Sequence, residues 1–351
     1  MGDFARAAER VLPRMVWDYF RSGADAESTL RANRRAFRRR VLLPRVLIDV
    51  SAVRAEVELL GARLPHPILV APTAFHKLAH PEGERATARG AAEAGALLVV
   101  STLATTSLED VAAASPGPKW FQLYAQRDRG ITRELVERAR DAGYLALMLT
   151  VDTPVLGRRL ADVRNAFALP EGMAMENLRG AAGGVDAALE SAVAAHVAAR
   201  HESALGWRDL EWLAGLSSLP LVLKGVLRGD DAARAASAGV AGVVVSNHGG
   251  RQLDGVPATL DVLPRVVDAV AGRCPVLVDG GIRWGTDALK ALALGARAVL
   301  VGRPVLWGLA VGGADGVARV LTSLRDELVL AMTLAGCPDL ATVTADLVEP
   351  R

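Results

Sequence analysis

Residues 246–254, SNHGGRQLD, place a histidine, two glycines and an arginine directly after the apolar run AGVVV. Imidazole is the side chain whose pKa suits general-base catalysis near neutral pH, and a guanidinium binds carboxylates through paired hydrogen bonds. Asp152, in TVDTP, could orient the imidazole of His248 and stabilise its protonated form. A lone histidine is more often structural, but this one stands beside Arg251. The pattern therefore indicates proton abstraction from a bound anion, with His248 as the base.

Eight short apolar runs must position these groups. They are PILVAPTA, ALLVVSTLA, KWFQLYA, LALMLTVDTP, PLVLKGV, AGVVVSNHGG, PVLVDGG and RAVLVGRP. Continuous rather than alternating apolar runs are typical of parallel strands covered on both faces. Ala-rich helical stretches lie between many of them, and four of these end at Gly95, Gly143, Gly239 and Gly295, where a left-handed residue is favoured. The pattern predicts an α/β protein with a (β/α)8 barrel; a doubly wound open sheet is the alternative.

The ends of these strands predict the pocket, because the loops after the strands build the active site of such a barrel. The polar, charged and glycine residues found there are Pro72, Thr73, Ala74, Ser101, Gln122, Tyr124, Thr150, Asp152, Lys224, Ser246, His248, Arg251, Asp279, Arg283, Gly302 and Arg303.

The last two strand ends, DGGIR and VGRP, indicate a phosphate site. Gly280, Gly281 and Gly302 allow the backbone to approach a phosphate closely, and Arg283 and Arg303 can bind its oxygens. Either motif alone would more simply be interpreted as turn glycines beside solvated arginines, without a phosphate site. The two motifs together favour the phosphate.

The composition excludes several classes of protein. The chain has 351 residues, is 51% hydrophobic and 23% charged, and carries a net charge of +2, so it is neither disordered nor suited to nucleic acid. Cys274 and Cys337 are too few for a disulfide framework, and we find no metal-ligand spacing. Arg, Pro or Asp interrupts each long apolar stretch, and we see no signal pattern, so we expect a cytoplasmic protein without membrane spans.

The whole chain is predicted to be one domain, with a barrel over residues 67–335, a segment before it, a segment after it and one long insertion within it. Residues 1–66 are predicted to be helical, with an Arg-rich helix whose arginines form a solvated or subunit-contacting face. Residues 171–206 are predicted to be an active-site lid, in which His196 and His201 are ordinary surface residues. The tail, residues 336–351, is predicted to contain a helix.

Several ordered motifs carry a family resemblance. SNHGGRQLDG, LTVDTPVLGRR, KGV, DGGIRWGTDALKALALGA and GRP, within a similarity that runs from about Val11 to Leu334, resemble the FMN-dependent L-2-hydroxy acid oxidase and dehydrogenase family. The resemblance implies FMN as cofactor and oxidation of a 2-hydroxy acid to the 2-oxo acid. Reduced flavin would pass its electrons to O2, giving H2O2, or to a quinone or other acceptor. His248 would act by either a hydride or a carbanion route, of which we favour the first.

The resemblance also implies roles for the strand-end residues. Lys224 would lie beside N1 and the carbonyl oxygen of the flavin ring, and Asp279 would bind a ribityl hydroxyl. Arg159, Arg251 and Tyr19 would bind the substrate carboxylate, with Tyr124 near its hydroxyl. Neutral contacts to the flavin would come from Ala71, Pro72, Thr73, Ala74, Ser101, Gln122, Thr150 and Ser246.

Leu103 stands where relatives such as glycolate oxidase carry a bulky aromatic residue, which predicts a wider substrate pocket. Phe75, Met173 and Met175 are expected to add apolar lining. Lactate or mandelate is the preferred substrate class, and an oxidase is favoured because no fused haem domain or membrane insert is present. Other FMN barrels, such as isopentenyl diphosphate isomerases and nucleotide dehydrogenases, and a non-catalytic scaffold remain alternatives. Relatives are commonly tetramers, which implies a homo-oligomer.

Overall fold

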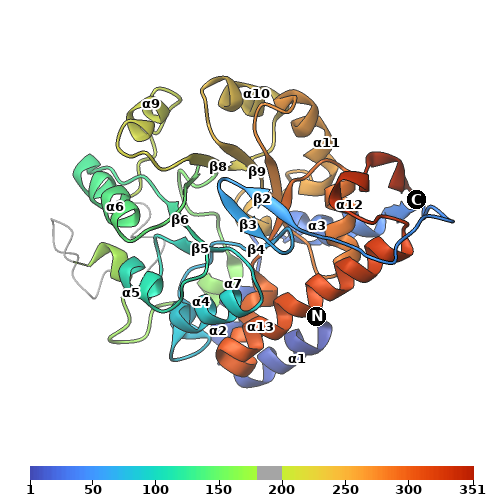
Figure 1. The fold of residues 1–351 in the computed structure, drawn as a ribbon. Coiled ribbons are helices and arrows are strands. Elements are labelled where there is room, and N and C mark those ends of the chain that lie inside the picture. Colours follow the sequence, from blue (N-terminus) through green and yellow to red (C-terminus); the bar gives the residue numbers. More distant parts are fainter. Residues whose placement is uncertain (180–199) are drawn as a thin grey trace.

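The computed structural model describes residues 1–179 and 200–351 and places a closed parallel barrel at their centre (Figure 1). The order around the barrel is β10-β11-β4-β5-β6-β7-β8-β9. Its strands are β4 (Ile68–Val70), β5 (Leu98–Ser101), β6 (Lys119–Leu123), β7 (Leu147–Thr150), β8 (Leu221–Val226), β9 (Gly242–Val245), β10 (Val276–Asp279) and β11 (Ala298–Val301). All eight predicted strands and the predicted (β/α)8 class are confirmed, and the open-sheet alternative is excluded.

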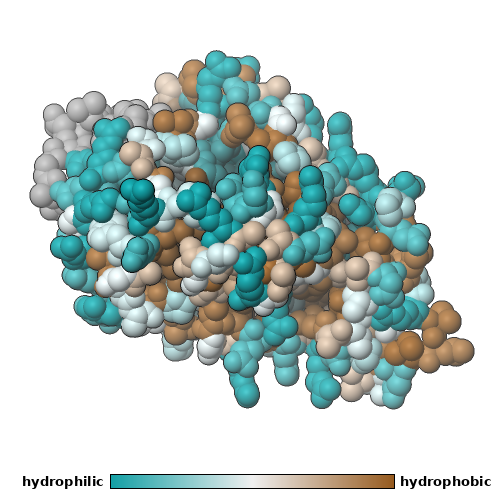
Figure 2. All heavy atoms as spheres, turned by 90° about the horizontal axis from the view of Figure 1, so that it is seen from above, coloured by the Kyte–Doolittle hydropathy of each residue, from teal (hydrophilic) through white to brown (hydrophobic). Residues whose placement is uncertain are grey.

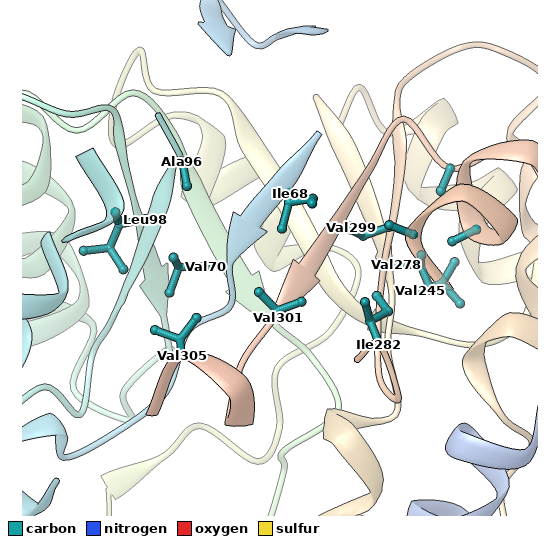
Figure 3. Close-up of a cluster of buried hydrophobic side chains, with 14 of the residues drawn as sticks. Ile68, Val70, Ala96, Leu98, Val245, Val278, Ile282, Val299, Val301 and Val305 are labelled. Carbon is teal, nitrogen blue, oxygen red and sulfur yellow. The ribbon is translucent and has the colours of Figure 1, made fainter. Parts of the chain in front are cut away.

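Apolar side chains cover both faces of these strands. Leu69 and Leu300 belong to the cluster inside the barrel, which the hairpin of β2 (Val57–Leu59) and β3 (Ala62–Leu64) also joins. Their neighbours Ile68, Val70, Val299 and Val301 belong to the outer cluster, which the helices cover, and Figure 3 shows these four side by side on β4 and β11. Burial on both faces explains why the strands have continuous rather than alternating apolar sequences.

Helices follow the strands and surround the barrel (Figure 1). They are α4 (Gly83–Glu93), α5 (Leu108–Ala113), α6 (Arg129–Asp141), α7 (Leu160–Arg164), α9 (Asp209–Ala214), α10 (Gly229–Ser237), α11 (Thr259–Val270), α12 (Gly285–Ala293) and α13 (Arg303–Leu334). The four predicted stop glycines all have positive φ, from 72° at Gly95 to 97° at Gly295. This left-handed conformation turns the chain from each helix into the next strand.

The N-terminal segment contains α1 (Gly2–Val11), α2 (Arg14–Arg21) and α3 (Ser28–Arg38). Helix α3 is the predicted Arg-rich helix, and Arg31, Arg35 and Arg38 are exposed as expected. Arg34 differs, because it is half-buried and donates to the Gly281 carbonyl and to Asp287. On the same helix, Asn33 exchanges two hydrogen bonds with Asn247, at 2.8 and 2.9 Å. Helix α3 therefore supports the two loops that carry the predicted base and the predicted phosphate site.

The predicted helix in the C-terminal tail is wrong. The tail forms two single 3-10 turns, Leu340–Thr342 and Ala345–Leu347, and then β12 (Val348–Pro350), which pairs antiparallel with β1 (Arg40–Leu42). Leu347 and Val348 are buried there, and Arg45 donates to Asp346. Tertiary packing against the distant β1 outweighs the local helical preference of this short segment.

The loop between β1 and β2 exposes apolar side chains. Val46, Leu47 and Ile48 are 78%, 101% and 44% exposed. The loop projects at the right of Figure 1, and brown atoms project on the same side in Figure 2.

Helix α13 is long and apolar enough, by length and composition alone, to cross a membrane. However, 61% of its most apolar window is buried inside the protein, and the backbone leaves helical geometry at Gly312 and Gly313. The helix packs against α4 and α12. These features are those of a kinked core helix.

Candidate active site

One cavity at the carboxyl ends of the barrel strands brings the predicted site residues together. It contains about 1100 Å³ of empty space, part of it open to solvent. The predicted residues that line it are Tyr19, Pro72, Thr73, Ala74, Ser101, Leu103, Gln122, Tyr124, Thr150, Arg159, Lys224, His248, Arg251, Asp279, Gly280, Gly281, Arg283, Gly302 and Arg303, together with Ala71. Asp152 and Ser246 lie behind the lining, where each contacts a residue that reaches the cavity.

His248 begins a tight left-handed turn after β9. Its φ is 56°, which is uncommon for a residue with a side chain, and Gly249 and Gly250 follow at 62° and 76°. A Cβ atom at Gly250 would lie 2.6 Å from the Leu30 nitrogen, so only glycine fits there. Ser246 Oγ accepts the His248 backbone N–H at 3.0 Å. This turn holds the imidazole at the cavity.

Asp152 pairs with His248 from the neighbouring loop. His248 Nδ1 and Asp152 Oδ1 are 3.0 Å apart, although the two residues are 96 positions apart in the sequence. Because Nδ1 faces the carboxylate, Nε2 is the ring nitrogen left to take a proton from a ligand in the cavity. This is the arrangement that the sequence predicted for a base and its orienting carboxylate.

Burial and charge set the protonation of this pair. Burial lowers the pKa of His248 below its usual 6.5, and Asp152 only partly offsets this effect. Burial acts to raise the pKa of Asp152, but His248 and Lys224 outweigh it and lower that pKa below its usual value. At neutral pH the imidazole is therefore uncharged and the carboxylate ionised, which is the state a general base requires.

A buried arginine and a half-buried one form a site for a carboxylate. Arg159 is 6% exposed, and its Nε has no hydrogen-bond partner within residues 1–179 and 200–351. Arg251 Nη1 donates to the Tyr19 and Ser22 carbonyls at 2.6 and 2.9 Å, and its guanidinium lies 5.0 Å from the centre of the Tyr19 ring. Burial, helped by the charge of Arg159, lowers the pKa of Arg251 to about 9. A bound anion would offset this unfavourable burial of like charges.

A lysine and a carboxylate form the charged pair at the base of the cavity. Lys224 Nζ lies 3.3 Å from Asp279 Oδ2 and donates to Ser246 Oγ at 3.0 Å. Asp279 Oδ1 is buried and has no partner among the described residues, so it can accept a hydrogen bond from a ligand hydroxyl.

Neutral side chains link three adjacent strands nearby. Ser101 Oγ donates to Gln122 Oε1 at 3.2 Å, and Gln122 Nε2 donates to Thr150 Oγ1 at 3.0 Å. The chain of bonds runs across the ends of β5, β6 and β7 and lines the cavity. It offers hydrogen-bonding groups in fixed orientations.

The predicted phosphate site contains two arginines in different surroundings. Arg283 packs over Trp307 at 4.8 Å, and burial lowers its pKa to about 9. Burial lowers the pKa of Arg303 to the same value, but its guanidinium also donates to three carbonyls, those of Phe20, Ser22 and Gly249. Arg303 therefore fastens the end of α2 to the His248 turn as well as lining the cavity.

The glycines of this site are needed for a further reason. Gly281 has a φ of 89°, and a Cβ atom there would lie 2.5 Å from the Asn33 carbonyl oxygen of α3. Close packing against α3, in addition to any approach of a phosphate, therefore requires glycine.

The prediction that His201 is an ordinary surface residue is wrong. His201 is 2% exposed, lines the cavity and stacks on Tyr124 with ring centres 4.5 Å apart. Backbone hydrogen bonds from Arg127 to Arg200 and from Glu202 to Ala125 hold this segment against the loop after β6. The stacking contact joins segments that are far apart in the sequence, and no local sequence pattern predicts it. His196 and much of the predicted lid lie outside the described residues.

The predicted apolar lining also needs correction. Phe75 and Met175 are buried in the core, and neither these two nor Met173 line the cavity. Phe75 packs against Tyr19 instead, at 5.8 Å between ring centres. Leu156, which carries no recognisable motif in the sequence, lines the cavity together with Leu103. No group of three or more metal-ligating side chains occurs in the described parts of the chain.

Comparison with known proteins decides the family. The family model described as FMN-dependent dehydrogenase matches residues 8–350. The chain belongs to this family. It is 55% identical over 347 residues to an L-lactate oxidase of Nostoc sp., covering 97% of this chain and 95% of that one. It is 50% identical over 343 residues to glycolate oxidase 1 of Zea mays, covering 97% and 93%.

Solved structures of the FMN-dependent dehydrogenase family agree with this assignment. A mandelate oxidase with (S)-4-hydroxymandelic acid superposes with a TM-score of 0.93 at 46% identity, covering 100% of this chain and 98% of that one. The resemblance drawn from the motifs is confirmed, and with it an FMN-dependent oxidoreductase of the 2-hydroxy acid oxidase type. The interpretation as a non-catalytic scaffold loses its support.

The residues of the cavity suit FMN. Arg283 and Arg303, both half-buried and with lowered pKa values, can bind a phosphate together with the glycine turns, and the unpaired oxygen of Asp279 can accept from a hydroxyl. Lys224 supplies a buried positive charge and the Ser101–Gln122–Thr150 chain supplies neutral donors and acceptors. These groups match the phosphate, ribityl chain and ring of this cofactor.

Replacing Arg283 with leucine is expected to raise the Kd for FMN about tenfold to a hundredfold, because a charge-assisted hydrogen bond to the phosphate is lost. Titration of the cofactor-free protein with FMN, followed by flavin fluorescence, measures the effect. Arg283→Lys is the matched control and should retain part of the affinity. An unchanged Kd in the leucine variant would mean that Arg283 does not bind the phosphate.

Proposed function

We propose that this protein oxidises an L-2-hydroxy acid to the 2-oxo acid and passes the electrons to O2, giving H2O2. One observation carries the proposal: a histidine paired with a carboxylate shares its cavity with the guanidinium groups of Arg159 and Arg251. A base and a pair of arginines that can bind a carboxylate, in one cavity, suit a substrate that carries both a hydroxyl and a carboxylate.

The residues of the cavity have separate roles in the proposed reaction. Arg159 and Arg251 bind the substrate carboxylate, with Tyr19 adjoining them. His248 Nε2 takes the hydroxyl proton, Tyr124 lies beside that hydroxyl, and Asp152 stabilises the resulting imidazolium. When bound, FMN would supply the redox chemistry: it would take the α-carbon hydrogen with its electron pair as a hydride, and the two electrons would then reduce O2 to H2O2 with the protons released.

The substrate that we propose has a medium-sized aliphatic or aryl side chain, such as lactate or mandelate. Leu103 and Leu156 give the cavity an apolar wall without a large ring at position 103. The similarity to a lactate oxidase and to a mandelate oxidase supports this class.

Replacing Leu103 with tryptophan is expected to lower kcat/KM for mandelate about tenfold to a hundredfold, because the added ring fills space that the aryl group needs. Glycolate, which has no side chain, should lose much less. Steady-state kinetics with both acids on the same preparation measures the ratio. If mandelate and glycolate lose equally, Leu103 does not border the substrate side chain.

The electron acceptor separates an oxidase from a dehydrogenase. The relatives reported above are named as oxidases, which supports O2. Peroxide formed under air should match the 2-oxo acid produced, without added acceptor. Turnover only with a quinone or an artificial acceptor would favour the dehydrogenase, and a purified protein that binds no FMN would overturn the proposal.

We also propose a cytoplasmic location and a homotetramer. Cys274 and Cys337 are both free, as expected in a reducing compartment. The exposed apolar loop at Val46, Leu47 and Ile48 is the kind of surface that a subunit contact would cover. Cell fractionation and sedimentation equilibrium test the two proposals, and a monomer in solution would refute the second.

A further inference from the structure

A buried histidine that has no part in the proposed reaction lies directly behind the cavity. His76 is 2% exposed and begins the 3-10 turn His76–Leu78 after β4. Its Nε2 lies 2.5 Å from Thr73 Oγ1, and Thr73 lines the cavity. Its Nδ1 lies 2.8 Å from Thr87 Oγ1 on α4. Both ring nitrogens therefore have hydroxyl partners, and each bond needs one donor and one acceptor.

One arrangement of the network places the ring proton on Nδ1. Thr87 Oγ1 lies 3.4 Å from the Gly83 carbonyl four residues earlier on α4, and when its hydrogen points to that carbonyl the oxygen accepts from His76 Nδ1. Burial lowers the pKa of His76, which leaves one proton on the ring. Nε2 is then an acceptor, and the Thr73 hydroxyl donates to it.

A buried carboxylate holds this turn in place. Glu84 is 3% exposed, and its Oε1 accepts the backbone N–H groups of His76 and Thr105 at 3.0 and 2.8 Å. Its Oε2 accepts from the Thr106 hydroxyl at 2.9 Å. Glu84 thus joins the loops after β4 and β5 by accepting backbone N–H groups from both. It does not contact the His76 ring nitrogens, whose hydrogen-bond partners are Thr73 and Thr87.

We infer that His76 is a positioning residue that fixes Thr73 as a hydrogen-bond acceptor toward the bound cofactor. The Thr73 hydroxyl donates its only hydrogen to His76, so toward the cavity its oxygen can only accept a hydrogen bond. Such an oxygen suits an N–H of the flavin ring and disfavours a ring carbonyl or an unprotonated ring nitrogen. A freely rotating hydroxyl would serve either kind of atom.

Nitrogen NMR tests the proton assignment directly. The FMN-loaded enzyme is labelled with ¹⁵N-histidine, measured by magic-angle spinning, and the His76 signals are identified by their loss in His76→Gln. The expected result is a neutral ring protonated at Nδ1. A ring protonated at Nε2, or at both nitrogens, would reverse the polarity of Thr73 and overturn the inference.

Cofactor binding provides the second test. Thr73→Val should raise the Kd for FMN by up to about tenfold, the effect of one hydrogen bond, and His76→Leu should raise it by less, because the freed hydroxyl can still accept but is no longer oriented. The two changes should be non-additive in the double variant, because His76 acts on the cofactor only through Thr73. His76→Gln offers an amide oxygen to Thr73 and an amide N–H to Thr87, so its Kd should stay within about twofold of the original. Additive effects, or a Gln variant as weak as the Leu variant, would contradict the inference.

These measurements use no substrate. A result against 2-hydroxy acid oxidation would leave them unaffected, and their failure would leave the proposed reaction standing. If His76→Leu does not fold, the NMR assignment together with Thr73→Val and His76→Gln keeps the test decisive.

Discussion

Replacing His248 with asparagine is expected to slow anaerobic, substrate-driven bleaching of the bound flavin by about 10²–10⁴-fold, the usual contribution of a general base. The amide can still bond to Asp152 across the 3.0 Å contact, but it cannot take a proton at neutral pH. Stopped-flow absorbance with an L-2-hydroxy acid measures the rate, and the visible spectrum shows that FMN remains bound. A variant that bleaches as fast as the unmodified enzyme, with its cofactor in place, would remove the basis of the proposed mechanism.

The pH dependence provides a second readout of the same residue. Only the uncharged imidazole acts as a base, so kcat/KM should rise with pH as His248 loses its proton. Burial holds its pKa below 6.5, so the midpoint of the rise should lie below pH 6.5. Asp152 raises the pKa of His248, and Asp152→Asn should therefore move the rise to still lower pH while also slowing the reaction. A rise centred above pH 6.5 would contradict this assignment.

Replacing Arg159 with leucine is expected to raise KM for the hydroxy acid about a hundredfold, because the buried one of the two guanidinium partners of the carboxylate is lost. Arg159 suits this test because its buried Nε has no hydrogen-bond partner in the described residues. Arg251, in contrast, also binds two backbone carbonyls, so its loss would disturb the fold as well. Steady-state kinetics gives KM, and FMN content should be unchanged.

The neutral amide of the same hydroxy acid is the control for Arg159. It lacks the negative charge, so the enzyme should discriminate strongly against it, and the leucine variant should lose most of that discrimination. Arg159→Lys keeps a charge without the planar pair of donors and should fall between the two. Equal losses for the acid and the amide would show that Arg159 acts on the fold and not on the carboxylate.

The barrel and the residues at its strand ends could be predicted from the sequence, because each strand and turn depends on a few neighbouring residues. A run such as AGVVV is apolar on both faces, which only a covered parallel strand satisfies, and a glycine such as Gly295 permits the left-handed turn that precedes the next strand. Once the barrel is accepted, its geometry brings every strand's carboxyl end to one rim. The convergence of Lys224, His248 and Asp279 follows from their positions at those ends.

Other features depended on contacts between distant segments. His201 belongs to a stretch with no strand or motif of its own, and backbone pairing with the loop after β6 places it on Tyr124. The tail pairs with β1, more than 300 positions earlier in the chain, and so forms a strand instead of the expected helix. Phe75 belongs to the core because Tyr19 of α2 packs against it.

The sequence by itself therefore determined the barrel, the family and the set of side chains at the strand ends, because strand periodicity, turn glycines and motif residues act over a few neighbouring positions. The tertiary structure alone decided which groups meet: His248 with Asp152, Arg303 with three backbone carbonyls, and His76 with Thr73. The physical reason is that hydrogen bonds and ring contacts depend on distances of a few ångströms. Those distances are set by the packing of segments that are far apart in the sequence.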